Sequence, residues 1–224
     1  MQNYEALICE AEKELAPVFE RLNAIETENT RRVLRAFQKH RVSARNFAPT
    51  TGYGYDDIGR DALSEIIAEV FGAEKALMRP QIASGTHALA LCLYGMLRPG
   101  ETLLSAAGKP YDTLEEVIGI AGEAGSGSLK DFGIGYKQVE LKNGALDEEG
   151  ILNAITPDVK LVLIQRSRGY DWRPSLSVDE IDRMIERIHA AHPGVNVMVD
   201  NCYGEFTEER EPGHVGADLM AGSM

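Results

Sequence analysis

Residues 160–200 read KLVLIQRSRGYDWRPSLSVDEIDRMIERIHAAHPGVNVMVD. The two ends of this stretch, residues 160–165 and 195–200, are short apolar runs of the kind that form buried strands. Between them, residues 177–192 predict a helix that begins with a Ser-x-x-Glu capping box. A strand, a helix and a second strand in this order require a crossover connection, which is typical of two parallel strands covered by a helix.

The same alternation continues from this unit toward the N-terminus. We predict strands at 76–83, 101–107 and 136–141 and helices at 60–72, 87–97, 112–122 and 146–155. This order indicates an α/β fold with a mostly parallel sheet flanked by helices. Residues 1–50 are expected to form a helical N-terminal segment, with a helix from residue 4 to about residue 45 that Pro17 interrupts. Residues 51–224 are then the domain that contains the sheet.

Composition and charge argue against several classes of protein. The 224 residues carry a net charge of −12, whereas nucleic acid or an anionic membrane as the main partner requires a basic surface. No apolar run approaches the roughly 18 residues of a membrane helix. The N-terminus lacks the basic and apolar regions of a signal peptide, so we expect a cytoplasmic location. The three cysteines have no C-x-x-C spacing, and we expect neither a metal site nor a disulfide framework.

Ligands of open parallel sheets bind at the carboxyl ends of the strands, so residues that follow a strand are candidates for a site. Ser84, Gly85 and Thr86 follow the predicted strand at 76–83 and open a helix. The free N–H groups and the positive end of that helix can bind a phosphate, and Gly85 allows close approach of the backbone. Plain helix capping is the alternative, because Ser and Thr are common N-caps. The sequence has no P-loop or dinucleotide-binding fingerprint.

Asp200 and Tyr111 also follow predicted strands. Asp200 closes the apolar run at 195–200, where a carboxylate is costly unless it has a partner. The pyridine nitrogen of pyridoxal phosphate is such a partner, because an acid that keeps it protonated makes the ring an electron acceptor. A turn or capping aspartate is the alternative. Tyr111 can stack on a flat cofactor ring, or it can pack at a helix start as an ordinary rim tyrosine.

Three stretches of the chain resemble one family. They are YGYDDIGRDALSEIIAEVFGAEKALMRPQIASGTHAL (53–89), GKPYDTLEEVIG (108–119) and VMVDNCYGEFTEEREPGHVGADLMAGSM (197–224). From about residue 5 to its last residue, the chain is similar to the aluminium-resistance or methionine gamma-lyase-like family. This family is a branch of the cystathionine lyase group of pyridoxal-phosphate enzymes. The resemblance implies the aspartate-aminotransferase fold (fold type I), with residues 51–224 as the cofactor-binding large domain.

The resemblance implies pyridoxal 5'-phosphate as the cofactor and assigns roles to residues of this chain. Residues that match cofactor contacts of the family are Ser84, Gly85, Thr86, Tyr111, Asp200 and Ser223. The residues at 84–86 and Ser223 would lie at the phosphate, and Asp200 would pair with the ring nitrogen. Tyr111 would lie on the ring face and assist proton transfer during catalysis.

Two tyrosines suggest an oligomer. Tyr53 and Tyr55 fall near the place where the related lyases send a tyrosine into the phosphate site of a neighbouring subunit. We therefore expect a homodimer or a homotetramer with shared active sites, which agrees with the closed symmetry usual among oligomers. A small amino acid is the expected substrate, and we expect no nucleic-acid or membrane partner.

The resemblance also implies the position of the Schiff-base lysine, because Ser223 matches a serine that lies three residues before this lysine in the related lyases. The lysine is therefore expected just beyond Met224, and no lysine follows Asp200 in this chain. The small C-terminal domain of the family is also expected to be absent from this stretch. We therefore interpret the chain as the N-terminal part of a longer protein, which would be inactive by itself.

The intact protein is expected to be a carbon–sulfur lyase that acts on cystathionine, methionine or cysteine through a carbanion-stabilised elimination. An aminotransferase or a decarboxylase on the same fold is the alternative, because this half of the site does not distinguish the reactions. A non-catalytic structural module is a further alternative, since the chain ends before the lysine.

Overall fold

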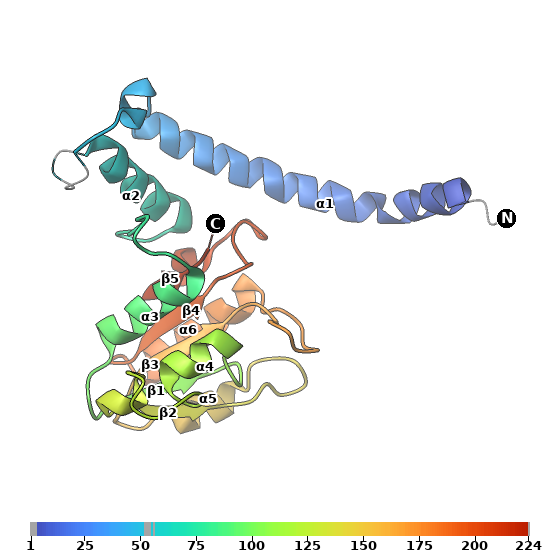
Figure 1. Cartoon of the computed structure of the whole chain (residues 1–224). Coiled ribbons are helices and arrows are strands. Elements are labelled where there is room, and N and C mark those ends of the chain that lie inside the picture. The colour runs from blue at the N-terminus through green and yellow to red at the C-terminus, as the bar shows by residue number, and fades with distance from the viewer. Residues whose placement is uncertain (1–3, 52–54, 56, 224) are drawn as a thin grey trace.

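The computed structural model describes residues 4–51, 55 and 57–223. Within this range, five strands form one parallel sheet in the spatial order β2-β1-β3-β4-β5 (Figure 1). The strands are β1 (Thr102–Ser105), β2 (Gly135–Gln138), β3 (Val159–Gln165), β4 (Asn196–Asp200) and β5 (Leu219–Ala221). The α/β fold with a parallel sheet is therefore confirmed.

The sheet is covered by helices, and a long N-terminal helix leads away from it (Figure 1). The α-helices are α1 (Tyr4–Lys39), α2 (Ile58–Phe71), α3 (Gly85–Met96), α4 (Asp112–Ile118), α5 (Glu148–Ala154) and α6 (Val178–Ala191). Short 3-10 helices occupy η1 (Ala44–Phe47), η2 (Lys130–Phe132) and η3 (Pro212–Val215). The capping box predicted at the start of α6 is confirmed, because Ser177 and Glu180 each bind the other's backbone N–H group.

The central strand β3 explains why the sheet needs helices on both faces. Its side chains alternate between the faces, as the period of two in a strand requires. Leu161 and Leu163 pack in a buried cluster with α3 and α4. Val162 and Ile164 pack in a second buried cluster with α5 and α6. Both faces are therefore dry, and the strand reads in the sequence as a nearly continuous apolar run.

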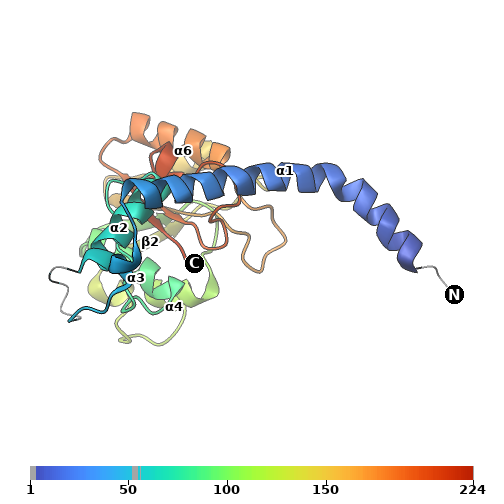
Figure 2. The same ribbon diagram turned by 90° about the horizontal axis from the view of Figure 1, so that it is seen from above.

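The predicted interruption of the first helix at Pro17 is wrong. Helix α1 runs through Pro17 and ends at Lys39 rather than near residue 45, although Figure 2 shows it bent near its N-terminal end. A proline removes one backbone hydrogen bond, and the carbonyl that it frees on this exposed helix can bind water instead. None of the helices in the described part of the chain, α1 included, combines the length and apolarity that a membrane crossing demands.

The predicted strand at 76–83 is also wrong, because residues 73–83 form no helix or strand. This stretch contains Pro80, which has no N–H group for a sheet ladder and is disfavoured in strands. The edge strand β5, which was not predicted, lies beside β4 instead. It has only three residues, too few for a recognisable alternation.

A buried arginine fixes the connection between β4 and β5. Arg166 follows β3 directly, is 3% exposed, and donates five hydrogen bonds through its guanidinium group. The acceptors, at 2.6–3.3 Å, are Leu176 O, Asn201 Oδ1, Gly204 O, Thr207 Oγ1 and Glu208 Oε1. Four of these five groups belong to the β4–β5 connection. The fully buried Glu211 in the same connection has a carboxylate oxygen 3.7 Å from this guanidinium.

Replacing Arg166 with Met should therefore destabilise the fold strongly. The change removes the buried cation nearest to Glu211. Removing one partner of a buried ion pair lowers the free energy of unfolding by about 3–5 kcal/mol. Arg168→Met is the matched control, because Arg168 lies two residues away and is exposed. Urea unfolding of both variants measures the difference. Equal unfolding free energies for the two variants would contradict the structural role of Arg166.

Candidate cofactor site

Three strand ends meet at one edge of the sheet. Gln165 of β3 pairs with Asp200 of β4, and Asp200 pairs with Ala221 of β5. The backbone continues this alignment one residue further, since the N–H of Arg166 donates to Asp200 O at 3.0 Å and the N–H of Asn201 donates to Ala221 O at 2.8 Å. Side chains that follow these strands therefore project from a common edge, which is where ligands of parallel sheets bind.

Asp200 is a buried carboxylate without a cation. It is 3% exposed, and its Oδ1 accepts a hydrogen bond from the N–H of Cys202 at 3.1 Å. No ion pair joins it to an arginine, lysine or histidine among the described residues. Burial raises the pKa of Asp200, while hydrogen bonds from Cys202 oppose the shift and the nearby Glu205 adds to it. The carboxylate would thus be stabilised by any cationic group that reached it.

Cys202 contributes to this environment and was not among the predicted residues. Its backbone N–H donates to Asp200 Oδ1 at 3.1 Å, which keeps its side chain close to this acid. Burial first, and then the charge of Asp200, raise the pKa of Cys202 to about 12. The thiol therefore stays protonated at neutral pH, which argues against a role as a nucleophile.

Gly85 at the start of α3 lies against the same edge. A Cβ atom added at Gly85 would stand 3.3 Å from Cys202 Sγ and 3.4 Å from Ser223 Cβ. The structure therefore brings together three of the predicted positions, Gly85, Ser223 and the strand end at Asp200. The tight spacing explains why the smallest residue occupies this position, next to the free N–H groups of a helix start.

The hydroxyl groups on either side of Gly85 are already engaged. Ser84 caps α3, accepting a hydrogen bond from the N–H of His87 at 3.1 Å. Thr86 Oγ1 lies 2.8 Å from Thr113 Oγ1, which links the starts of α3 and α4. Helix capping, the alternative considered for this tripeptide, is therefore confirmed for Ser84. It leaves the backbone N–H groups, rather than the hydroxyl groups, as the first donors for an anion.

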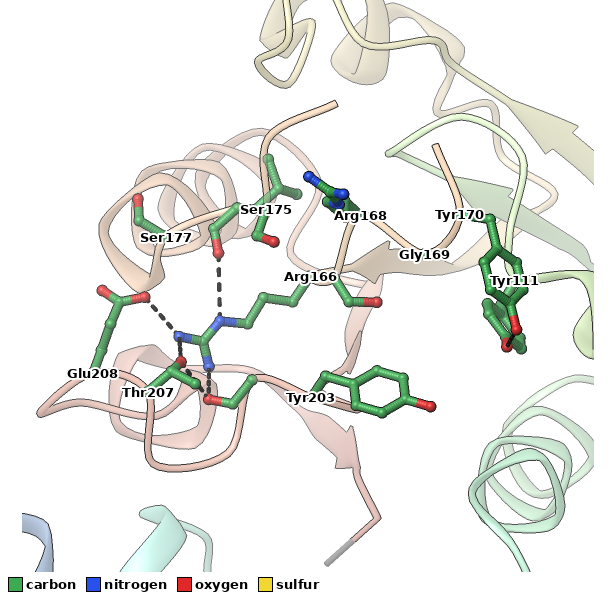
Figure 3. Close-up of a pocket in the computed structure, with 13 residues that line it drawn as sticks. Tyr111, Arg166, Arg168, Gly169, Tyr170, Ser175, Ser177, Tyr203, Thr207 and Glu208 are labelled. Atoms are coloured by element: carbon green, nitrogen blue, oxygen red, sulfur yellow. Dashed lines mark hydrogen bonds and ion pairs between the residues drawn. The ribbon is translucent and has the colours of Figure 1, made fainter. Parts of the chain in front are cut away.

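Tyr111 lies between β1 and α4, and a hydrogen bond to the last residue of β3, Gln165, fixes its backbone. Its N–H donates to Gln165 Oε1 at 2.7 Å. Its ring stacks on Tyr170 with the centroids 5.4 Å apart, and the two hydroxyl groups are 3.0 Å apart (Figure 3). The hydrogen bond with Tyr170 is the main reason that the pKa of Tyr111 rises to about 12. One face of the Tyr111 ring is therefore occupied by a tyrosine that sequence reasoning missed.

Of the remaining two predicted residues, only Tyr55 belongs to the described part of the chain, and it lies apart from this edge. Tyr55 is 82% exposed in the connection before α2, a helix of 14 residues that spans about 21 Å. Figure 1 shows that one end of α2 points away from the sheet, and Tyr55 precedes the first residue of this helix, Ile58, by three positions. Tyr53 lies outside the described residues. Tyr55 therefore does not contribute to the cluster around Asp200 within this chain.

A cavity of about 600 Å³ adjoins the cluster (Figure 3). Its lining includes Tyr111, Tyr170, Tyr203 and Arg168, but not Gly85, Asp200 or Ser223. Tyr203 is 80% exposed and adopts a positive φ of 68°, which directs the chain sharply after β4. The strand-end rule could have found Arg166 and Tyr203, because each follows a predicted strand closely. The cavity is thus a neighbouring space that shares Tyr111 with the candidate site.

The chain is similar to a set of known proteins over almost its full length. The family model for methionine gamma-lyase matches residues 4–224. The protein YnbB of Bacillus subtilis is 53% identical over 216 residues, which cover 96% of this chain and 51% of YnbB. The chain therefore spans about half the length of this curated relative.

The chain is also similar to solved structures. A candidate cystathionine beta-lyase involved in aluminium resistance from Listeria innocua is 47% identical with a TM-score of 0.95, covering 100% of this chain and 55% of that one. A carbon–sulfur lyase involved in aluminium resistance from Clostridium novyi NT is 45% identical with a TM-score of 0.91, covering 96% of this chain and 51% of that one. The chain belongs to the methionine gamma-lyase family.

Proposed function

We propose that the full-length protein is a pyridoxal-phosphate-dependent carbon–sulfur lyase and that this chain supplies part of its cofactor site. The observation that carries the proposal is the Asp200 carboxylate, which is buried at a strand end and has no ion pair with any of the residues that the structure describes. A buried charge of this kind is unfavourable unless a partner compensates it. The protonated nitrogen of a pyridine ring is a partner with the required charge and shape.

The residues around Asp200 fit the rest of the cofactor. Gly85 has no side chain at the point where a Cβ atom would meet Cys202 and Ser223, so a ligand can approach the helix start. The free N–H groups and the dipole at that start favour a phosphate group. The helix start at Gly85 would hold the phosphate of such a molecule, and Asp200 would hold its ring nitrogen. The fit supports pyridoxal phosphate and not a nucleotide, for which the chain has no fingerprint.

Each residue would then have a defined role. When bound, the cofactor supplies an electron sink for the carbanion formed on an amino acid. Asp200 would hold the proton on the ring nitrogen, and the backbone N–H of Cys202 would orient the carboxylate. The N–H groups near Gly85 and the Ser223 hydroxyl would bind the phosphate. Tyr111, with Tyr170 behind it, would present its remaining ring face to the cofactor and hold a proton on its hydroxyl group.

The choice of reaction is supported by the family and not by this half of the site. The relatives named above are described as a cystathionine beta-lyase candidate and a carbon–sulfur lyase, which favours elimination from a sulfur amino acid. An aminotransferase or a decarboxylase would use the same ring-nitrogen acid. The lysine beyond Met224, a small C-terminal domain, the domain boundary near residue 50 and subunit sharing through Tyr53 or Tyr55 stay predictions.

The reaction itself is tested with the full-length protein loaded with the cofactor. Cystathionine, cysteine and methionine are supplied separately, and keto acid release is measured with and without an added acceptor keto acid. A lyase releases pyruvate or 2-oxobutyrate together with a thiol or sulfide and needs no acceptor. Turnover that depends on the acceptor would assign the protein to the aminotransferases instead.

Asp200→Asn should separate stability from function in the full-length protein. Burial raises the folded-state pKa of Asp200, so the stability present at low pH is lost as the pH rises through that pKa. Asparagine mimics the protonated acid, and the cofactor-free variant should therefore unfold at a higher temperature than the wild type at pH 7. The difference should vanish at a pH below the ordinary pKa of aspartate, near 4.

The same variant should lose turnover by on the order of 100-fold, because a neutral amide cannot hold the charge on the ring nitrogen. Asp171→Asn is the control. Asp171 is exposed, so this substitution should change neither the unfolding temperature nor the turnover. Thermal unfolding of the cofactor-free protein and steady-state turnover of the loaded protein are the two measurements. Full activity in Asp200→Asn would remove this residue from the proposed role.

Gly85→Val should weaken cofactor binding with little effect on distant parts of the fold. The added side chain would stand against Cys202 and Ser223 and close the approach to the helix start. Losing one hydrogen bond to a charged group costs about 1.5–3 kcal/mol, so affinity should fall by about 10- to 150-fold. Gly95→Val lies in the same helix with no atom within 4 Å of its Cβ position, and it controls for helix propensity. Equal cofactor affinities in a titration of both variants would exclude the phosphate contact.

A further inference from the structure

The cavity beside the candidate site does not include the proposed cofactor contacts at Gly85, Asp200 and Ser223. Its volume of about 600 Å³ lies within the range of about 300–1,000 Å³ that is typical of pockets for small molecules. The connections after β3 and after β4 form most of its lining, and Tyr111 after β1 completes it. All three segments leave the carboxyl edge of the sheet, so a ligand that extends from the cofactor past Tyr111 can enter the cavity.

The lining of this cavity contains a cation that no acid compensates. Three charged side chains take part, Arg166, Arg168 and Glu208, which are two cations and one anion and give a formal charge of +1 on a chain with a net charge of −12. Arg166 and Glu208 pair with each other at 2.6 Å. Arg168 is exposed and forms no ion pair with any residue that the structure describes. The positive charge of Arg168 therefore favours an anionic ligand.

Arg168 also keeps its hydrogen-bond donors. Its guanidinium carbon lies 5.8 Å from the centroid of the Trp172 ring, within the range of a cation–π contact. This contact orients the guanidinium group but uses none of its five N–H donors, and none of them donates to a described residue. A guanidinium group with free donors can bind both oxygens of one carboxylate. Arg168 is thus better suited to a carboxylate than to a neutral group.

Hydroxyl groups add further donors to the lining. Those of Ser177 and Thr207 already bind other groups of the protein. Those of Ser175 and Tyr203 form no hydrogen bond with a described residue. Figure 3 shows Arg168 and Ser175 along one side of the cavity and Tyr203 along another side. The lining therefore offers hydrogen-bond donors to an anion from more than one side.

We propose that this cavity holds the distal end of the amino-acid substrate and that Arg168 selects substrates in which this end carries a carboxylate. The inference rests on the proposed function, because the reacting end of the substrate has to lie at the cofactor next to Tyr111. The sulfur and the methylene groups of the substrate then pass the rings of Tyr111 and Tyr170, which form an apolar wall of the cavity. The substrate class is a sulfur amino acid with a second carboxylate. Cystathionine has this group, whereas methionine and cysteine lack it.

Two cysteine conjugates that differ in one group test the selection. The distal end is a carboxylate in S-(2-carboxyethyl)cysteine and a neutral amide of nearly the same shape in S-(2-carbamoylethyl)cysteine. In the full-length protein loaded with its cofactor, Arg168→Gln should lower kcat/KM for the carboxylate by about 10- to 100-fold and leave kcat/KM for the amide nearly unchanged. Arg168→Lys keeps the charge and should retain part of the preference. The same pair of conjugates built on homocysteine detects a gamma-elimination.

Arg183→Gln is the matched control, because Arg183 is exposed on α6 and lies outside the lining of the cavity. It should change kcat/KM for neither conjugate. Arg168→Gln that lowers kcat/KM equally for the carboxylate and the amide would assign Arg168 to the shared part of the substrate, and it would overturn the proposal. Equal kcat/KM values of the wild type for the two conjugates would overturn it as well.

A binding measurement separates failure of this inference from failure of the proposed function. The analogue 2-aminopimelate carries a methylene group in place of the sulfur and cannot undergo the elimination, and 2-aminoheptanoate lacks its distal carboxylate. In calorimetric titrations, the wild type should bind 2-aminopimelate at least about tenfold more tightly than 2-aminoheptanoate, and Arg168→Gln should bind the two equally. This preference without turnover of any conjugate would reject the lyase and support the cavity assignment. Turnover without the preference would reject the cavity assignment alone.

Discussion

The structure depends on the way in which charge is distributed at the ends of β3 and β4. Arg166 and Asp200 are adjacent across the two strands, joined by a backbone hydrogen bond, yet their side chains do not pair. The guanidinium of Arg166 turns to the β4–β5 connection, where Glu208 and the buried Glu211 receive it. Asp200 is left as a buried acid with a raised pKa. This arrangement is what supports the proposal that a positive group of a ligand binds at Asp200.

The parts of the fold that follow local rules could be predicted from the sequence. The β3–α6–β4 unit was predicted because its apolar runs and its capping box are written within short stretches. The three-residue strand β5 carries no such pattern, and it forms because β4 offers it a ladder of hydrogen bonds. Tertiary context therefore decided the position of β5. Residues 76–83 contain apolar residues like a strand, but Pro80 lacks the N–H group that a sheet ladder needs, and this stretch is irregular.

The residues of the candidate site also divide into those that local rules predict and those whose positions depend on tertiary packing. Asp200 and Gly85 could be found because each follows from a rule about strand ends or helix starts, and the family resemblance added Ser223. The stacking of Tyr170 on Tyr111 could not be predicted, since it depends on how the connection after β3 folds back over β1. The strand-end rule could have pointed to Arg166, but an arginine after a strand is usually solvated, so its burial to 3% exposure could not be predicted.

A structure of the full-length protein with its cofactor bound tests the central claim most directly. The account predicts that a carboxylate oxygen of Asp200 lies within hydrogen-bonding distance of the ring nitrogen, at about 2.6–3.2 Å. The phosphate should then lie against the backbone at Gly85, at the start of α3. A cofactor whose ring nitrogen faces another residue, with Asp200 still buried and unpaired, would contradict the account.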